Sequence, residues 1–554
     1  LSLVGSEMCI RDSNNFSDLQ EITQDSNVTD SSIVYKNLEN QMFESGELYC
    51  DIGDDISQTE INKYNATLDQ WELSQGYGIS IEDGHASIKS YEESTLFILD
   101  KLISRNLDFP DKSLTNERFL KSCGINFEDE QKLLAIKNIF KKSNVALIYG
   151  AAGTGKTKLM KYISSLMADS NKLYLAKTHT ALQNLKRRID DADEANSESI
   201  DGFVKRNTFA SYDVIFVDEC STIDNRTMRK LLEKIDDNCK LVLAGDIYQI
   251  ESIDFGNWFY YAKDIVQTEG ANVELLNTWR TEKQELKDLW KSVRTMDSII
   301  TEKLVIDGPF SSEIGQKILQ SSDDDEVILC LNYDGKFGLN NMNAYFQNVN
   351  PNKEYHWAEW SYKVGDRIIF LDTKRSNALY NNLKGKIIDI EKDETSIWFT
   401  IDVYADIEEW QFNAEDIMFI GTEDGKTRIK IEVIQVDDET STEADRLKSI
   451  VPFQVSYAVS IHKAQGLEYN SVKIIIPSSN AEKITHSIFY TAITRAKEKL
   501  KIFWSAETMD SVVKGFEKEA GNSKSLKLIK EKLGIDKRKA SIVLLGGGGR
   551  HFIG

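Results

Sequence analysis

A segment of eight residues, Gly150-Ala-Ala-Gly-Thr-Gly-Lys-Thr157, limits the possible folds of this chain more than any other feature. It follows the apolar run 145–149 and precedes a helix-like stretch at 158–163. Its glycines permit backbone conformations in which successive N–H groups point at one anion, and the N-terminus of the next helix adds a positive field. The segment therefore predicts a strand, a phosphate-binding loop and a helix, with a nucleoside triphosphate as the ligand.

The residues of this loop have distinct expected roles. Lys156 reaches the outer phosphates as a point charge, and the Thr157 hydroxyl completes the shell of a Mg²⁺ ion that bridges two phosphates. The other positions are expected to offer backbone N–H groups and close approach to the phosphates: Gly150, Gly153, Thr154 and Gly155. ATP and Mg²⁺ are therefore the predicted ligands.

From Phe127 onward, the chain alternates short apolar runs with amphipathic segments. Strands are expected at 145–149, 173–176, 214–217 and 241–244, and helices near 156–167, 181–189 and 226–235. Such alternation predicts βαβ crossovers and a parallel sheet. A second α/β unit is expected from residue 280, with strands at 327–331, 472–476 and 500–503. The predicted fold class is α/β.

Within the second unit, residues 341–439 have a different character. Runs of β-formers at 364–370, 385–390 and 396–401 lie between Gly and Asn turns and predict a small β-barrel insert. The remaining expected parts are an acidic N-terminal region at 14–115, a first α/β domain at 116–275, a second at 276–340 and 440–510, and a C-terminal helix and tail at 511–554.

The formal net charge of −22 over 554 residues is unevenly distributed. Residues 14–115 hold 20 Asp/Glu and 6 Lys/Arg, so the rest of the chain is nearer balance and can still contain a basic groove. We expect this N-terminal region to be partly ordered, or else a solvated linker. Protein partners stay open, with this region as one place of attachment. Residues 1–13 resemble a translated sequencing adapter and are left out of the fold prediction.

Six scattered cysteines without a Cys-x-x-Cys pair favour reduced thiols and a cytoplasmic location over disulfides or a metal site. No apolar run approaches the roughly 18 residues that a membrane span needs. The sequence therefore predicts no membrane partner.

Two neighbouring carboxylates, Asp218 and Glu219, follow the apolar run 214–217. Parallel sheets hold their sites at this carboxyl edge. Asp218 is expected to bind the Mg²⁺ through its water shell, and Glu219 to orient or deprotonate the attacking water. The next strand is followed by Gln249, whose carboxamide can sense a γ-phosphate because it both donates and accepts hydrogen bonds.

Two arginines, Arg280 and Arg495, lie far from the loop in sequence. If the second α/β unit docks across the first, both can reach the γ-phosphate as arginine fingers, which stabilise the charge of the transition state. The expected catalytic set is thus Lys156, Asp218, Glu219, Gln249, Arg280 and Arg495.

Taken in chain order, these motifs resemble those of superfamily 1 helicases. The matching segments are Gln131, the phosphate loop, 176–182, 200–203, 218–221, 245–249, Arg280, 460–468 and 490–495. The insert beginning at Val364 and the segment His462-Lys-Ala-Gln-Gly466 are similar to the RecD-like branch, superfamily 1B. The resemblance implies two RecA-like motor domains, an SH3-like insert, and 5′ to 3′ movement on single-stranded DNA.

The same resemblance implies the remaining site residues. ATP would lie between the motor domains, with Gln131 near the adenine, Glu468 near the ribose and Gly466 among the other residues that bind the nucleotide. Single-stranded DNA would contact hydroxyl, imidazole and aromatic groups that bind phosphates or stack on bases: Thr178, His179, Phe203, Ser460 and His462. Tyr248 and Trp258 are further stacking candidates, and the short segment 205–212 leaves little room for a strand-separating pin.

The leading hypothesis is an ATP-driven translocase on single-stranded DNA and a 5′ to 3′ DNA helicase. An RNA-directed ATPase stays open because backbone contacts alone do not report the sugar. A nucleotide-gated binding protein without translocation is the alternative from another class. Glu219 and the two arginines disfavour it, since a switch does not need fast hydrolysis.

Overall fold

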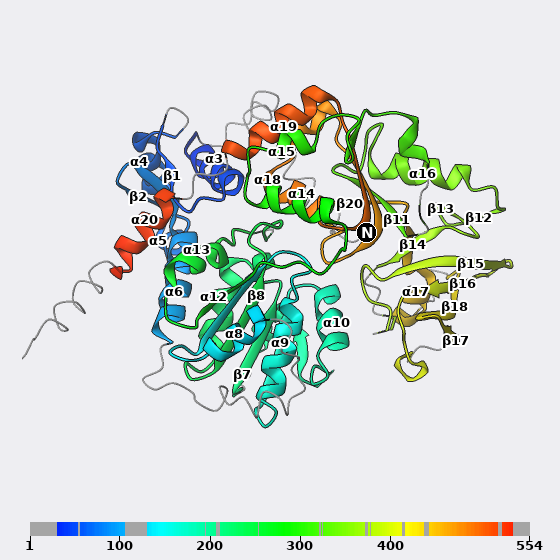
Figure 1. The fold of residues 1–554 in the computed structure, drawn as a ribbon, viewed down its shortest axis with the longest axis horizontal. Helices are drawn as coiled ribbons and strands as arrows, with labels where there is room; N and C mark the ends of the chain where they lie inside the picture. The colour runs from blue at the N-terminus through cyan, green and yellow to red at the C-terminus, as the bar shows by residue number, and fades with distance from the viewer. Residues whose placement is uncertain are drawn as a thin grey trace, which may run out of the picture.

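The computed structural model of the chain is shown in Figure 1. It describes residues 30–53, 56–105, 130–193, 195–206, 211–252, 254–320, 323, 325–371, 375–376, 378–412, 416–436, 442–518 and 523–535. The adapter-like residues 1–13 and the end of the expected tail therefore lie outside the described residues.

The first parallel sheet contains the phosphate loop. Its strand order is β6 (Ser197–Ser199), β5 (Lys172–Ala176), β7 (Val214–Asp218), β8 (Lys240–Gly245), β4 (Val145–Gly150) and β9 (Asn272–Leu275). The helices of this domain are α8 (Glu130–Asn138), α9 (Lys156–Leu166), α10 (His179–Arg188), α11 (Ile200–Lys205), α12 (Asn225–Lys234) and α13 (Trp258–Ile265). The strands predicted for this domain are confirmed. β6 and β9 were not predicted, because both are short and partly polar.

Burial explains why this sheet forms the centre of its domain. Every residue of β4, β5 and β7 is buried, as expected for parallel strands that helices cover on both faces. Alternate residues of β4 enter different cores: Leu147 and Tyr149 join one hydrophobic cluster, and Ala146 and Ile148 join another. The polar loops of the domain are therefore left at the carboxyl edge of the sheet.

The second parallel sheet has the order β10 (Ser311–Ser312), β22 (Ala496–Phe503), β21 (Tyr469–Ile475), β11 (Glu326–Cys330) and β20 (Ala458–Ser460). Its helices are α14 (Gln284–Arg294), α15 (Ile300–Lys303), α16 (Leu339–Val349), α18 (His486–Ile493) and α19 (Ala506–Lys518). Asn343 of α16 exchanges hydrogen bonds of 2.8 and 3.0 Å with the backbone of Ala458, so α16 packs on this sheet. An α/β fold with parallel sheets is thus confirmed.

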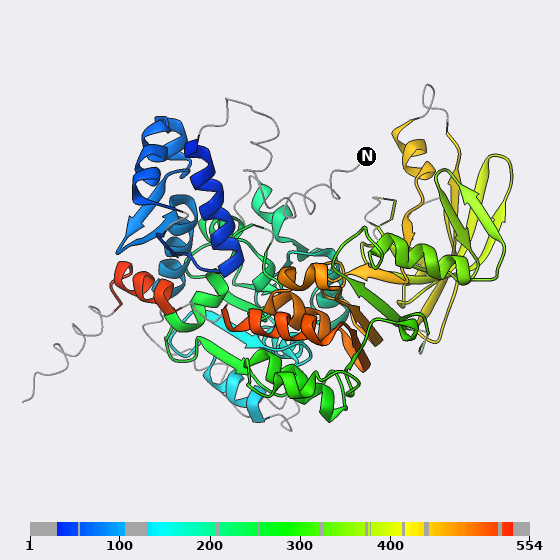
Figure 2. The ribbon, with the colours of Figure 1, turned by 90° about the horizontal axis from the view of Figure 1, so that it is seen from above.

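An antiparallel sheet interrupts the second domain. Its order is β17 (Ile417–Glu423), β18 (Lys426–Ile434), β16 (Ser396–Val403), β15 (Lys384–Lys392), β14 (Arg367–Phe370) and β19 (Phe453–Val455), with a hairpin of β12 (Glu354–Trp357) and β13 (Trp360–Lys363) and helix α17 (Glu443–Ser449) beside it. Buried residues alternate along β16 and β18, because only one face of the sheet is covered. Figures 1 and 2 show this insert at one end of the molecule.

The acidic N-terminal region is folded over residues 30–53 and 56–105. Its elements are α3 (Asp30–Ser45), α4 (Gln58–Thr67), α5 (Gln70–Ser74), α6 (Lys89–Ser104) and a sheet of β1 (Cys50–Asp51), β3 (His85–Ile88) and β2 (Ile79–Glu82). Leu38, Leu99 and Leu102 are fully buried in a core that also contains Trp258 of α13. These residues are therefore a folded extension of the first domain and not a solvated linker.

The C-terminal helix α20 (Ser523–Lys532) lies beside this N-terminal region, far from the insert (Figures 1 and 2). Lys532 Nζ lies 2.6 Å from a Glu92 carboxylate oxygen, and Lys524 Nζ lies 2.8 Å from Asp51. Part of the acidic charge is thus compensated by lysines from the other end of the chain. None of the described helices is long and apolar enough to cross a bilayer.

Candidate nucleotide site

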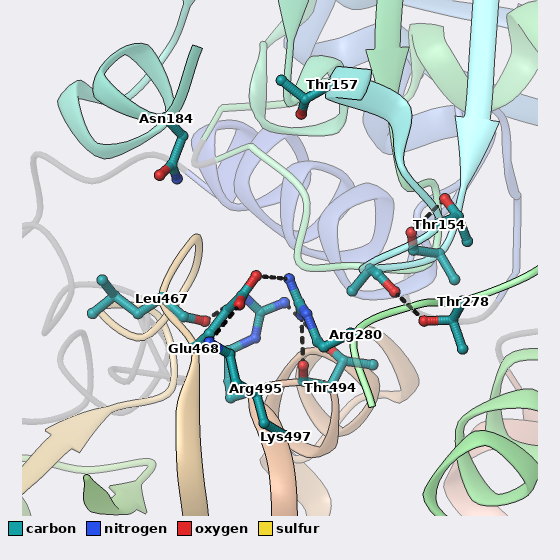
Figure 3. A network of polar contacts seen from close by, with 12 residues as sticks. Thr154, Thr157, Asn184, Thr278, Arg280, Leu467, Glu468, Thr494, Arg495 and Lys497 are labelled. Carbon is teal, nitrogen blue, oxygen red and sulfur yellow. Dashed lines mark hydrogen bonds and ion pairs between the residues drawn. The ribbon is translucent and has the colours of Figure 1, made fainter. Parts of the chain in front are cut away.

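The phosphate loop connects β4 to α9, and its glycines are required sterically. Gly153 and Gly155 have φ angles of +77° and +88°, which other residues rarely adopt. A Cβ on Gly153 would lie 2.3 Å from the Cβ of Arg280. The Thr278 hydroxyl also donates to the Ala152 carbonyl at 3.0 Å, as Figure 3 shows. The loop therefore packs directly on the segment that carries the first predicted arginine.

Lys156 begins α9, and its ammonium group lies against the loop. Its Nζ donates to the carbonyl oxygens of Gly150 (2.7 Å) and Ala151 (3.2 Å). Burial lowers the pKa of Lys156, whereas Asp246 and Asp218 act in the opposite sense. A cation in this position, beside the backbone of the loop, is suited to an outer phosphate.

Thr157 and the two predicted carboxylates meet at the end of β7. The Thr157 hydroxyl lies 3.3 Å from Asp218 Oδ2, and the Glu219 N–H donates to Asp218 Oδ1 at 2.9 Å. Glu219 adopts a left-handed backbone conformation, with φ 54° and ψ 42°. This conformation costs about 1–2 kcal/mol for a residue with a Cβ, and such strain is typical of functional sites.

The Glu219 side chain is half-buried, and its surroundings disfavour the ionised carboxylate. Burial, and then the neighbouring Asp218, raise its pKa to about 7, although Arg495 and Lys156 act to lower it. The Thr178 hydroxyl lies 3.5 Å from Glu219 Oε2. A carboxylate with this pKa can accept a proton near neutral pH, which is the property that a general base needs.

The two predicted arginine fingers lie together on the opposite side of the site (Figure 3). Arg280 donates to the Thr494 carbonyl at 2.7 Å and forms an ion pair of 2.6 Å with Glu468. Arg495 is buried, and its guanidinium donates to the carbonyls of Thr491 (2.9 Å) and Leu467 (3.2 Å). Burial, and then repulsion from Arg280, lower the pKa of Arg495 to about 10.

Glu468 compensates this concentration of positive charge. Burial opposes its ionisation, but Arg280 at 2.6 Å and Lys497 at 3.1 Å lower its pKa to about 2. The Nε of Arg280 is buried without a hydrogen-bond partner among the described residues, so this guanidinium can still bind an anion.

The segment that carries Gln249 contacts the second domain. The Gln249 Nε2 donates to Asp246 Oδ2 at 3.2 Å within the first domain, whereas the N–H of the next residue, Ile250, donates to the Thr491 hydroxyl at 2.9 Å. The Thr491 carbonyl also accepts from Arg495, so the residue next to the predicted γ-phosphate sensor and the second finger contact the same residue of α18.

The residues predicted for DNA binding are less concentrated. Thr178 caps α10 by accepting from the Ala181 N–H at 3.1 Å, and His179 begins that helix. Phe203 is 4% exposed and packs on Tyr212 in the core of the first domain. The Ser460 hydroxyl accepts from the Lys463 N–H at 3.2 Å, in the loop that also carries His462. The structure thus brings Thr178 to Glu219 but places Phe203 in the core.

The stacking candidates and the adenine contact can be located only in part. Trp258 is fully buried, and its Nε1 donates to the Ile223 carbonyl at 2.8 Å, so it is a core residue. The guanidinium carbon of Arg294 lies over the ring of Tyr248, 5.0 Å from the ring centroid. Helix α8 contains Gln131, whose side chain lies outside the described residues.

Lys497 and Asp246 are two members of the site that the sequence analysis did not single out. Lys497 lies near the start of β22, two positions after Arg495, which directly precedes that strand. The closeness of Lys497 to a predicted arginine finger could have indicated from the sequence that it belongs to the site. Asp246 lies at the end of β8, where a parallel sheet holds its site, and this position was the signal in its case.

Comparison with known proteins gives two family-model matches. The AAA domain matches residues 126–304, and the UvrD-like helicase C-terminal domain matches residues 455–502. The first range contains the phosphate loop, both carboxylates and Arg280, and the second contains Arg495.

Individual proteins are similar to this chain over most of its length. RecBCD enzyme subunit RecD of Buchnera aphidicola subsp. Schizaphis graminum is 21% identical over 79% of this chain and 85% of its own length. The subunit RecD of Mycolicibacterium smegmatis is 22% identical over 68% of this chain and 71% of its length. Among solved structures, the Pif1 helicase from Candida albicans covers 74% of this chain and 99% of its own, with 15% identity and a TM-score of 0.44.

The fold and the site define a P-loop nucleoside triphosphatase in which a second α/β domain completes the site of the first. The two matched family models together span residues from both sides of this site. The chain is thus similar to proteins named RecD, subunits of the RecBCD enzyme, and to the UvrD-like helicase C-terminal domain.

Proposed function

We propose that the chain moves along single-stranded DNA in the 5′ to 3′ direction, using ATP bound between two RecA-like motor domains. The observation that carries the proposal is the meeting of Lys156 and Glu219, from the first domain, with Arg280 and Arg495, which the second domain holds. A nucleotide in this cleft touches both domains at once. Its hydrolysis can therefore change the distance between them.

The chemistry follows from the positions of these side chains. Glu219, with a pKa of about 7, accepts a proton from the attacking water. Arg280 and Arg495 stabilise the charge that develops on the transferred phosphoryl group, and Lys156 holds the same group from the loop side. When the phosphoryl bond is broken, the arginines lose this shared anion, and the two domains are no longer held by it.

Mg²⁺ belongs to the same proposal. The Thr157 hydroxyl and an Asp218 carboxylate oxygen are hard donors that lie 3.3 Å apart, which fits the ligand preference of this ion. When bound, Mg²⁺ supplies neutralising charge to the outer phosphates. Gln131, Gly466 and Glu468 are proposed to contact the adenosine.

For the nucleic acid, we keep the predicted residues Thr178, His179, Ser460 and His462; Phe203 is left out because it is packed in the core of the first domain. Thr178 has the strongest support because its hydroxyl lies 3.5 Å from Glu219, so a change in its position would reach the proposed base. We also propose that the antiparallel insert is SH3-like, since its strands form one continuous sheet over a mainly aliphatic core. The cytoplasmic location and an attachment role for the acidic region remain parts of the proposal.

Steady-state ATP hydrolysis by the whole chain tests this function. We expect single-stranded DNA to stimulate turnover more than RNA does, and Lys156→Ala and Arg495→Ala to abolish it. Lys158→Ala is the matched control, because Lys158 is an exposed lysine on the same helix. Turnover that ignores both polymers would move the assignment to a nucleotide-gated binding protein, and stimulation by RNA alone would make the chain an RNA-directed ATPase.

The direction of movement needs a separate readout. Displacement of a short duplex that carries either a 5′ or a 3′ single-stranded tail distinguishes the polarities. We expect displacement only from the 5′ tail, and displacement from the 3′ tail would contradict the proposed direction.

A further inference from the structure

A polar pocket of about 270 Å³ lies where three parts of the chain meet. Arg187 and Arg188 come from α10 of the first domain, Tyr380 and Lys384 from the insert, and Lys497 from β22 of the second domain. Two hydrogen bonds join these parts. The Thr180 hydroxyl donates to the Asn381 carbonyl at 3.1 Å, and Lys384 Nζ donates to the Glu468 carbonyl at 3.0 Å. Any molecule in the pocket therefore touches both domains and the insert.

The lining of this junction pocket has an excess of positive charge. Glu468 is the carboxylate of the lining, and it is already held by Arg280 (2.6 Å) and Lys497 (3.1 Å). Lys384 is held by Asp325 at 2.7 Å. Among the described residues, no carboxylate forms an ion pair with Arg187 or Arg188, and Arg187 donates instead to the Asn184 amide oxygen at 2.7 Å.

The pocket adjoins the proposed hydrolytic site through the segment 466–468. Gly466 lines the pocket, and a Cβ on it would lie 3.4 Å from Glu219 Oε1 and 3.6 Å from Thr180. The carbonyl of Leu467, the next lining residue, accepts from Arg495. Figure 3 shows Asn184, Glu468 and Lys497 around the same space, beside the two arginine fingers. One wall of the junction pocket is thus a wall of the site where a phosphate is released.

We propose that the junction pocket binds a phosphate group, separately from the triphosphate loop. Planar guanidinium groups with spare donors match a tetrahedral oxyanion, and amide and hydroxyl groups of Asn184 and Tyr380 complete the polar lining. The phosphate is either inorganic phosphate leaving the hydrolytic site or a phosphate of the nucleic-acid backbone. The choice between these sources rests on the proposed function, but the binding itself does not.

The binding experiment uses inorganic phosphate and ³¹P NMR line broadening with the whole chain and no nucleotide. A Lys156→Ala background weakens phosphate binding in the triphosphate loop. We expect this protein to broaden the signal, and Arg187→Gln with Arg188→Gln to raise the phosphate dissociation constant about tenfold or more. The matched control, Arg226→Gln with Arg229→Gln on α12, removes the same charge outside the pocket and should leave phosphate binding unchanged. Arg187→Lys with Arg188→Lys should restore part of the phosphate binding, because lysine restores the positive charge but not the paired N–H donors of a planar guanidinium.

Two further measurements on the arginine variant identify the source. Slower phosphate release during single turnover, with unchanged affinity for single-stranded DNA, assigns the pocket to released phosphate. Weaker DNA binding with a salt dependence reduced by about one or two ions assigns it to the backbone. Equal ³¹P broadening in the arginine variant and the α12 control would overturn the proposal. Because the binding measurement needs neither ATP nor DNA, failure of the translocase function would leave its result standing.

Discussion

The two domains that border the nucleotide cleft contribute differently to it. The first supplies a cradle made from neighbouring segments, in which Lys156 contacts its own loop and Asp218 meets Thr157 across one sheet. The second supplies charged groups whose positions depend on contacts between distant segments, such as the pairing of Arg280 with Glu468. The difference suggests that the first domain binds the nucleotide and the second makes it react.

Replacing Arg495 with lysine tests this division most directly. Lysine keeps the charge but cannot reproduce the hydrogen bonds to Thr491 and Leu467, so the finger is lost as a positioned group. We expect kcat to fall by about 10³-fold, the lower part of the range for arginine fingers, while nucleotide affinity changes little. Steady-state hydrolysis assays measure kcat, and titration with a fluorescent ATP analogue measures the nucleotide affinity.

The counterpart variant belongs to the first domain. Lys156→Ala should reduce nucleotide affinity as well as turnover, because Lys156 contacts the phosphates before and during the reaction. If Arg495→Lys weakened nucleotide binding as strongly as Lys156→Ala does, the two sides of the cleft would not have separate roles.

A second difference between the domains is the folded acidic region, which extends the core of the first domain only. Leu99 of α6 is fully buried in the core that contains Trp258. Leu99→Ala should therefore lower the free energy of unfolding by about 2–5 kcal/mol, the usual effect of such a cavity. Urea unfolding measures the change. Leu73→Ala is the control, since Leu73 is 41% exposed and should shift stability by no more than about 0.5 kcal/mol.

The acidic region also shows where sequence reasoning reached its limit. Its low apolar content allowed either a partly ordered unit or a linker. The deciding contacts, between α6 and the helices of the first domain, join residues such as Thr95 and Asn225 that are far apart in the chain. By contrast, the strands β4, β5, β7 and β8 could be predicted because burial on both faces produces continuous apolar runs.

The candidate site divides in the same way. The phosphate loop and Asp218 could be predicted because each motif occupies one strand end, and the structure brings them together. Arg280 and Arg495 could also be predicted, because each lies in a segment that resembles a helicase motif. The role of Phe203 could not be judged from its motif, because its burial against Tyr212 depends on tertiary packing. The junction pocket was not foreseen, since three distant segments form it.

Glu468→Gln tests how far the second domain depends on compensating the charge of its arginines. The neutral amide removes the ionic partner of Arg280 and Lys497, so two like charges near Arg495 lose their compensation. We expect kcat/KM to fall about tenfold, the equivalent of about 1.4 kcal/mol. Glu498→Gln is the control, because this exposed glutamate of the neighbouring strand β22 forms only a long ion pair with Lys283, at 3.7 Å. An unchanged kcat/KM in Glu468→Gln would mean that Arg280 is held well enough by the Thr494 carbonyl alone.

The last prediction concerns the pH dependence of Glu219, a group whose pKa both domains influence. Burial and Asp218 raise the pKa of Glu219 to about 7, so this carboxyl keeps its proton to a higher pH than an ordinary glutamate. A protonated carboxyl cannot accept a proton from water. We therefore expect kcat/KM for ATP to rise with pH through about 7 and to fall about tenfold for each unit below it.

Two variants distinguish the possible causes of this pH dependence. An acid limb caused by protonation of ATP itself would persist in Glu219→Gln, whereas a limb caused by Glu219 would disappear from the residual activity. Arg495 lowers the pKa of Glu219, so Arg495→Gln should move the limb to higher pH in addition to reducing the rate. A limb near pH 4–5 in the wild-type protein would place Glu219 in an ordinary solvated environment, and the raised proton affinity would then not be part of the mechanism. A limb near pH 7 that ignores Arg495→Gln would mean that the second domain acts on the phosphate and not on the base.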